Sequence, residues 1–168
     1  MDIEALGLKL ITDFISEEEE KVILSNLAPP RKTTKSNLLR NSIKRYGSSL
    51  PYETNMVSDI IPNYLDKISQ KIVECGYLEI KPNSVSINEY LKGNSIAPHI
   101  DTKTSGEVIS ILSLLSDATM VFTKENETFS IKLPIRSLVQ MGGEIRYDWK
   151  HSVPPVKDTR YSIVFRLG

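Results

Sequence analysis

The second half of this chain consists of short stretches rich in β-branched residues, and their close spacing restricts the possible folds. Turn signals separate the stretches, among them Lys92-Gly93-Asn94, Lys124-Glu125-Asn126 and Gly142-Gly143. Many short strands at close spacing within one domain predict a sandwich or a barrel. We expect strands at residues 84–91, 108–115, 119–123, 128–133, 137–141 and 160–167.

The N-terminal half predicts helices instead. The sequence Ser16-Glu17-Glu18-Glu19 can form a capping box, and its acids suit the positive end of a helix dipole, so we expect a helix at residues 16–27. A second helix fits residues 62–75, which begin with a proline and carry an apolar stripe. A short strand can also be placed at residues 38–46.

The overall composition indicates an ordinary globular protein. A chain of 168 residues with 40% hydrophobic and 25% charged residues suits one domain with a substantial core. No apolar run is long enough to span a bilayer, and the N-terminus lacks a signal-peptide layout. The single cysteine excludes an internal disulfide and a cysteine-based zinc cluster. We therefore expect a monomer in the cytoplasm or nucleus, without a membrane partner.

Positive charge is concentrated in one stretch, although the formal net charge is zero. Residues 22–52 contain six basic side chains and no acidic one. Such a segment can bind the phosphates of a nucleic acid, but charge runs are more often solvated loops, and both interpretations remain open here. The six residues are Arg31, Lys32, Lys35, Arg40, Lys44 and Arg45.

The two histidines of the chain and one nearby aspartate have the composition of an iron site. His99 and Asp101 lie two apart, and such residues project from the same face of a strand. Together with His151 they supply the two-histidine, one-carboxylate ligand set of non-haem iron(II) oxygenases, which leaves positions for a co-substrate and dioxygen. Each residue alone has an ordinary structural explanation, because His-X-Asp occurs by chance and a lone histidine is often a packing residue. The combination favours iron(II).

The last expected strand carries two arginines that suggest a dicarboxylate co-substrate. Arg160, Ser162 and Arg166 share one face of this strand. Arginine binds carboxylates in a bidentate manner, so the pair beside an iron site indicates 2-oxoglutarate. Asn88 and Tyr90, also two apart, can add neutral hydrogen bonds. The alternative is an exposed strand face, where arginine is common.

In combination, these motifs resemble the AlkB family of iron(II)/2-oxoglutarate dioxygenases, in the family's order and over nearly the whole chain. His99-Ile100-Asp101-Thr102-Lys103 and Arg136-Ser137-Leu138 are most similar to the branch that oxidises a modified wobble uridine in tRNA, and we expect this chain to correspond to the catalytic domain of that branch only. The motifs are Asp13-Phe14-Ile15-Ser16, Arg45-Tyr46-Gly47, Pro51-Tyr52-Glu53-Thr54-Asn55, Asn88-Glu89-Tyr90, Gly93, Pro98-His99-Ile100-Asp101, Gly142-Gly143-Glu144-Ile145-Arg146, His151 and Arg160-Tyr161-Ser162-Ile163-Val164-Phe165-Arg166.

The resemblance implies a fold and a set of site residues. The fold is α+β and mainly β, a double-stranded β-helix (jelly roll) with supporting N-terminal helices. Residues 1–168 would form a single dioxygenase domain, with helical support and a candidate substrate lid in 1–80 and the jelly-roll core with the metal site in 81–168. Arg160 would bind the distal carboxylate of 2-oxoglutarate and Arg166 would lie near its iron-bound end. Iron(II) would be held by His99, Asp101 and His151, and Asn88, Tyr90 and Ser162 would assist in binding 2-oxoglutarate.

The implied activity is hydroxylation or oxidative demethylation of an alkylated or modified base in RNA or DNA. One alternative keeps the chemistry and changes the substrate to a protein side chain or a lipid-like molecule. Another is a non-catalytic binding module that retains the fold, although a complete ligand set and both arginines argue against loss of the site. Candidate substrate contacts are Lys44, Arg45, Tyr46, Tyr52 and Arg146.

Overall fold

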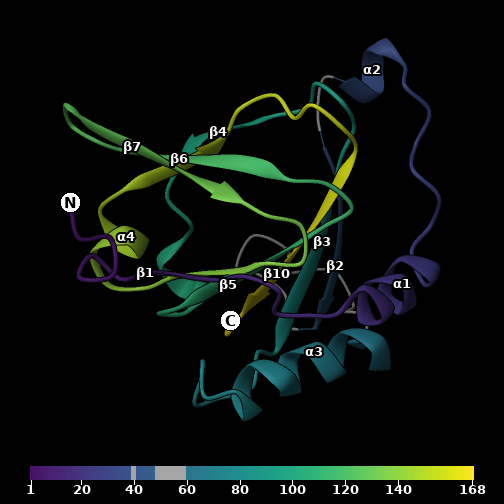
Figure 1. Ribbon diagram of the computed structural model, residues 1–168, viewed down its shortest axis with the longest axis horizontal. Coiled ribbons are helices and arrows are strands. Elements are labelled where there is room, and N and C mark those ends of the chain that lie inside the picture. Colours follow the sequence, from purple (N-terminus) through teal and green to yellow (C-terminus); the bar gives the residue numbers. More distant parts are fainter. Residues whose placement is uncertain (39–40, 48–59) are drawn as a thin grey trace.

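A computed structural model describes residues 1–38, 41–47 and 60–168, whose strands form two antiparallel sheets (Figure 1). The larger sheet has the order β1-β8-β5-β10-β3-β2 and the smaller β4-β9-β6-β7. Two such sheets packed together form the jelly roll expected from the sequence. The strands are β1 (Leu8–Ile11), β2 (Ser42–Gly47), β3 (Ser84–Tyr90), β4 (Ile96–His99), β5 (Ile109–Leu114), β6 (Ala118–Lys124), β7 (Glu127–Leu133), β8 (Leu138–Met141), β9 (Lys150–Val153) and β10 (Arg160–Arg166).

Two helices cover the outer face of the larger sheet, below it in Figure 1. The first begins with the expected capping box, in which the Ser16 hydroxyl accepts from the backbone N–H of Glu19 and the Glu19 carboxylate accepts from that of Ser16, each at 3.1 Å. None of the described helices is both long and apolar enough to cross a membrane. The helices are α1 (Glu17–Ser25), α2 (Lys35–Leu38), α3 (Asn63–Glu74) and α4 (Gly143–Tyr147), with a 3₁₀ turn at Lys103–Ser105.

The strand β10 is buried on both faces, because an apolar cluster lies on either side of the larger sheet. Tyr161, Ile163 and Phe165 belong to the cluster under α1 and α3. Val164 belongs to the cluster between the sheets. Strand alternation therefore turns the arginines at the ends of β10 toward the space between the sheets. Arg160 is only 1% exposed, which excludes the exposed strand face considered as an alternative.

The expected elements and the observed ones differ mainly in the shortest segments. All six strands expected after residue 80 and both expected helices are present, with bounds that agree within two residues. The strands β1 and β9 were not expected, and β4 was assumed only in the argument that placed His99 and Asp101 on one strand. Each has four residues, which gives little evidence of a period of two. The break expected at Gly142-Gly143 is present, since β8 ends at Met141, but it is the start of a short helix: Gly142 caps α4 and Gly143 begins it with φ +51°.

Candidate active site

The three expected metal ligands converge between the two sheets. The antiparallel pairing of β4 and β9 places His99 directly opposite His151, with their ring centroids 4.2 Å apart. The Asp101 Oδ1 atom lies 3.2 Å from His99 Nε2 and 3.8 Å from His151 Nε2. One ligand atom from each residue falls within 4.8 Å of the others, so a single ion can contact all three. Two imidazoles and one carboxylate on one side of the ion are the donor set suited to iron(II).

The route by which Asp101 reaches the site differs from the sequence argument. The expectation that His99 and Asp101 alternate along one strand is wrong, because β4 ends at His99 and Asp101 lies in the segment that follows. The carboxylate is nevertheless turned inward, with its side chain 8% exposed. The path of the backbone after β4 therefore determines where the Asp101 carboxylate lies.

Hydrogen bonds and burial prepare the two imidazoles for metal binding. His99 Nδ1 lies 2.8 Å from the Ala97 carbonyl oxygen, which can only accept, so Nδ1 carries a proton and Nε2 is the nitrogen left for a metal ion. The hydrogen bond to Asp101 raises the pKa of His99, whereas burial lowers the pKa of His151 to about 4. Burial opposes ionisation of Asp101, but the hydrogen bond from His99 and the charge of Arg166 lower its pKa overall, so the carboxylate is ionised near neutral pH.

The two arginines of β10 lie beside this ligand set. Arg166 Nη2 is 3.2 Å from Asp101 Oδ2, while Arg166 Nε is buried without a hydrogen-bond partner among the described residues. Arg160 packs over the Tyr90 ring, with 5.3 Å from the guanidinium carbon to the ring centroid. Its Nη2 is 3.5 Å from the Ser113 hydroxyl, and its Nε and Nη1 are buried and have no partner in the described part of the chain. Buried donors without acceptors fit the oxygen-rich co-substrate 2-oxoglutarate.

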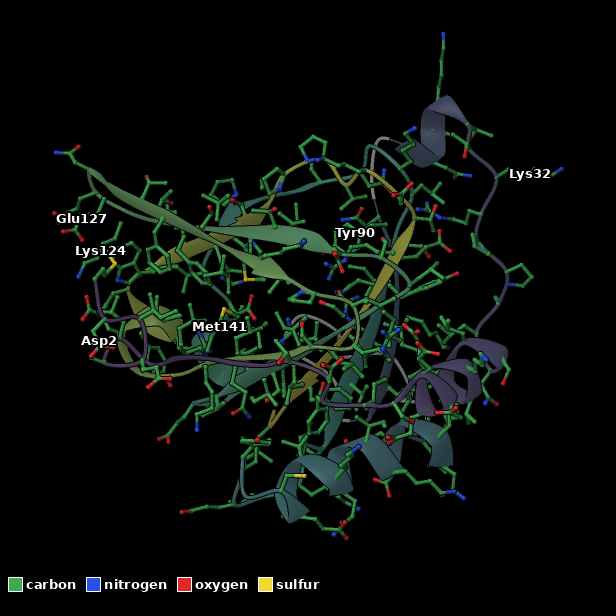
Figure 2. The ribbon with its side chains drawn as sticks, viewed as in Figure 1. Asp2, Lys32, Tyr90, Lys124, Glu127 and Met141 are labelled. Carbon is green, nitrogen blue, oxygen red and sulfur yellow. The ribbon has the colours of Figure 1, made fainter. Side chains whose placement is uncertain are left out.

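The remaining expected co-substrate residues lie in the same pocket. Asn88 Nδ2 donates to the Ser162 hydroxyl at 3.3 Å across the β3–β10 pair. Tyr90, labelled in Figure 2, comes from the end of β3, and burial raises the pKa of its hydroxyl, which stays protonated at neutral pH. All eight residues expected to bind metal and co-substrate line this one pocket. Its apolar wall, which the sequence argument did not identify, consists of Ile96, Ile111, Met120, Val153 and Val164.

The described residues that were expected to contact the substrate lie in different parts of the structure and do not form one surface. Arg45 lies opposite Ser86 on the face of β2 that looks toward the iron site, whereas its neighbour Lys44 lies opposite Ile87 on the face toward α1 and α3. Tyr46 shares the side of Lys44, and both line a different pocket. Arg146 is 3% exposed and donates to backbone carbonyls. Two residues of the sequence argument, Tyr52 and Arg40, lie outside the described residues.

Comparison with known proteins identifies relatives of this chain. The family model of the 2OG-Fe(II) oxygenase superfamily matches residues 30–166. The mouse protein named tRNA (carboxymethyluridine(34)-5-O)-methyltransferase ALKBH8 is 37% identical over 172 residues, which cover 94% of this chain and 26% of that protein. A Caenorhabditis elegans protein named DNA N6-methyl adenine demethylase is 30% identical over 90% of this chain and 55% of its own length. The chain therefore spans only about a quarter to a half of these relatives.

A solved structure supports the fold assignment independently. An oxidoreductase of the 2OG-Fe(II) oxygenase family from Burkholderia pseudomallei superposes with a TM-score of 0.71 at 13% identity. The match covers 98% of this chain and 85% of the other. At this low identity the likeness concerns the fold alone, and it agrees with the two-sheet architecture described above.

Proposed function

Because this chain belongs to the AlkB family of 2OG-Fe(II) oxygenases, we propose that it hydroxylates or oxidatively demethylates an alkylated or modified base in RNA or DNA. The observation that carries this proposal is that one pocket holds both the His-X-Asp…His set and two arginines with buried donors that have no partner among the described residues. The names of two relatives, a tRNA (carboxymethyluridine(34)-5-O)-methyltransferase and a DNA N6-methyl adenine demethylase, support a nucleic-acid substrate. Residues 1–168 would act as one catalytic domain.

In this proposal His99, Asp101 and His151 hold iron(II). The ion and 2-oxoglutarate supply the dioxygen activation that oxidises the substrate and yields succinate and CO₂, and the protein supplies position and electrostatics. His99 donates through Nδ1 to the Ala97 carbonyl, which fixes its ring so that Nε2 faces the other two ligands. The Asp101 carboxylate is kept ionised by Arg166 at its second oxygen.

The same proposal assigns 2-oxoglutarate to the two arginines of β10. Arg160 is deepest and has two unpartnered donors, so it suits the distal carboxylate. Arg166 already contacts Asp101 and suits the end of the co-substrate near the metal. Asn88 and Ser162, which are bonded to each other, and the protonated Tyr90 hydroxyl can add neutral hydrogen bonds.

A base must leave its stack to reach this pocket, so residues around the entrance are the proposed substrate contacts. Ile43 and Arg45 are both exposed on the face of the edge strand β2 that looks toward the site, and Ile43 lies directly opposite the pocket residue Asn88. An exposed apolar side chain beside a basic one suits a base and its phosphate. Lys32, labelled in Figure 2, extends from the segment between α1 and α2 and can add a phosphate contact.

The test is mass spectrometry of nucleosides from RNA and DNA treated with the iron-loaded protein and 2-oxoglutarate. Arg45→Ser should slow nucleic-acid oxidation and reduce the salt dependence of binding, because one phosphate contact is lost. Lys44→Ser removes a neighbouring charge from the opposite face of β2 and should leave both unchanged. If no modified nucleoside is lost while a protein or lipid stimulates succinate formation, the substrate class proposed here is wrong.

A further inference from the structure

Arg146, from α4, makes an unusual set of contacts for a buried cation. Its Nε donates to the Gly106 carbonyl at 3.1 Å, its Nη1 to the Asp101 carbonyl at 3.0 Å and its Nη2 to the Thr102 carbonyl at 2.6 Å. The Tyr147 ring covers the guanidinium, with its centroid 4.7 Å from the guanidinium carbon. Each of the three nitrogens therefore donates to a carbonyl of the segment that begins at the expected metal ligand.

The segment bound by Arg146 is short and has no strand pairing of its own. It leaves the smaller sheet at the end of β4 and enters the larger sheet at β5, with a single 3₁₀ turn in between. Within it, the Ser105 backbone N–H donates to the Thr102 carbonyl, and the two hydroxyls lie 2.7 Å apart. Gly106 has φ +88°, and a Cβ there would lie 2.7 Å from the Leu167 carbonyl oxygen. The backbone of the segment is thus held from two sides.

The helix α4, which carries Arg146, is itself held in place just before the strand that contains His151. The backbone N–H of Ile145 donates to the Leu6 carbonyl at 2.9 Å, and that of Gly142 to the Gly7 carbonyl at 2.9 Å. These bonds dock α4 against the N-terminal segment next to β1, as Figure 1 shows. Strand β9 with His151 begins three residues after α4 ends. The guanidinium therefore bridges the backbone of Asp101 and the element that leads into His151.

We propose that Arg146 is a positioning residue that sets the Asp101 backbone relative to His151 and so preorganises the iron site. The inference rests on the assignment of His99, Asp101 and His151 as iron ligands. Asp101 lies beyond the end of β4, so strand pairing alone does not fix it. The planar fork of arginine spans three carbonyls, and a lysine ammonium cannot reproduce that geometry. Arg146 does not line the pocket, and it contacts Asp101 through the backbone carbonyl and not through the carboxylate, so its effect on the metal is indirect.

Cobalt(II) binding by the metal-free protein tests this role without reference to turnover. Arg146→Met and Arg146→Lys should each weaken cobalt(II) binding by about 10- to 100-fold, the range usual for groups that orient metal ligands, with lysine the less damaging. The visible spectrum of the bound cobalt(II) should also change, because the carboxylate shifts relative to the imidazoles. Arg136→Met is the matched control, since Arg136 pairs with Glu20 at 3.2 Å on the α1 side of the larger sheet.

The control should lose thermal stability and keep the parent affinity and spectrum. Parent-like cobalt(II) affinity and spectrum in Arg146→Lys would overturn the proposal, and this holds even if Arg146→Met does not fold. An affinity loss in Arg136→Met as large as that in Arg146→Lys would also overturn it, because general destabilisation would then explain both. Asp101→Ala separates the two assignments. If that variant binds cobalt(II) as the parent does, the ligand assignment itself fails.

Discussion

Arg160 should destabilise the protein that lacks 2-oxoglutarate and stabilise the complex. Its guanidinium is 1% exposed, and Nε and Nη1 have no acceptor among the described residues. A buried polar group without a partner costs about 1–3 kcal/mol. Burial also lowers the pKa of Arg160, which is the direction expected when the charged form is disfavoured. Replacing the side chain with methionine, which is similar in length and apolar, removes this cost.

We therefore expect Arg160→Met to raise the free energy of unfolding by about 1–3 kcal/mol in the absence of 2-oxoglutarate. For a chain of this size, each kcal/mol corresponds to about 2–4 °C in the melting temperature. The same substitution should weaken 2-oxoglutarate binding by at least about tenfold to a hundredfold, because a hydrogen bond to a charged group is worth about 1.5–3 kcal/mol and Arg160 has two unpartnered donors.

Thermal unfolding with cobalt(II), with and without 2-oxoglutarate, measures both effects. At a concentration a hundred times its Kd, the co-substrate stabilises the parent by about 2.7 kcal/mol, whereas a variant whose Kd is tenfold to a hundredfold weaker gains about 0.4–1.4 kcal/mol. The lead of the variant in melting temperature should therefore shrink or reverse when 2-oxoglutarate is added. Arg136→Met is the control and should melt below the parent in both conditions, because it leaves Glu20 without its partner. An Arg160→Met variant that melts below the parent without 2-oxoglutarate and gains as much from it would refute this reasoning.

Three further outcomes follow from the site and its surroundings. Asp101→Ala should abolish iron-dependent succinate formation while circular dichroism remains that of a folded protein, and retained turnover would contradict the ligand assignment. Burial lowers the pKa of His151 to about 4, so the unfolded chain binds more protons between pH 6.5 and 4, and the metal-free protein should lose stability as the pH falls through this range. His151→Asn should remove that contribution, on the order of 3 kcal/mol by pH 4, in urea unfolding at several pH values. Gly106→Ala should lower the free energy of unfolding by about 2–4 kcal/mol, because its Cβ would strike the Leu167 carbonyl. Gly93→Ala is the control, with φ +92° and open space around the new Cβ, and should cost about 1 kcal/mol. Equal losses in the two variants would count against the steric cause.

The sequence predicted which three side chains come together at the candidate metal site, but one step of the argument was wrong. Period-two alternation predicted that His99 and Asp101 share a strand face, and the structure ends β4 at His99. Asp101 still reaches the other ligands, because backbone carbonyls after the strand are bound by Arg146. Carbonyl contacts of this kind leave no signature in the sequence, since every residue has a carbonyl. The residue types therefore predicted which side chains meet, but they did not predict the contacts that position Asp101.

The arginines of β10 were easier to interpret because one strand carries both the core and the site. Tyr161, Ile163 and Phe165 alternate with the polar residues, and this pattern correctly separated the two faces. The pattern did not say whether the polar face meets water or a pocket. That difference depends on the smaller sheet, whose strands β4 and β9 are only four residues long and escaped detection.

The basic stretch shows why a charge count along the chain overstates a binding surface. Six basic residues without an acid suggested one phosphate-binding edge, but strand alternation in β2 turns the adjacent Lys44 and Arg45 to opposite faces of the larger sheet. Arg31 points away from the site as well, because it forms an ion pair with Glu89 on the face of β3 toward α1 and α3. Among the described residues of the stretch, those on the face of β2 toward the smaller sheet are placed to contact a base at the iron site. Replacing the stretch as a whole would therefore mix structural and substrate-binding effects, whereas the pair Arg45→Ser and Lys44→Ser separates them.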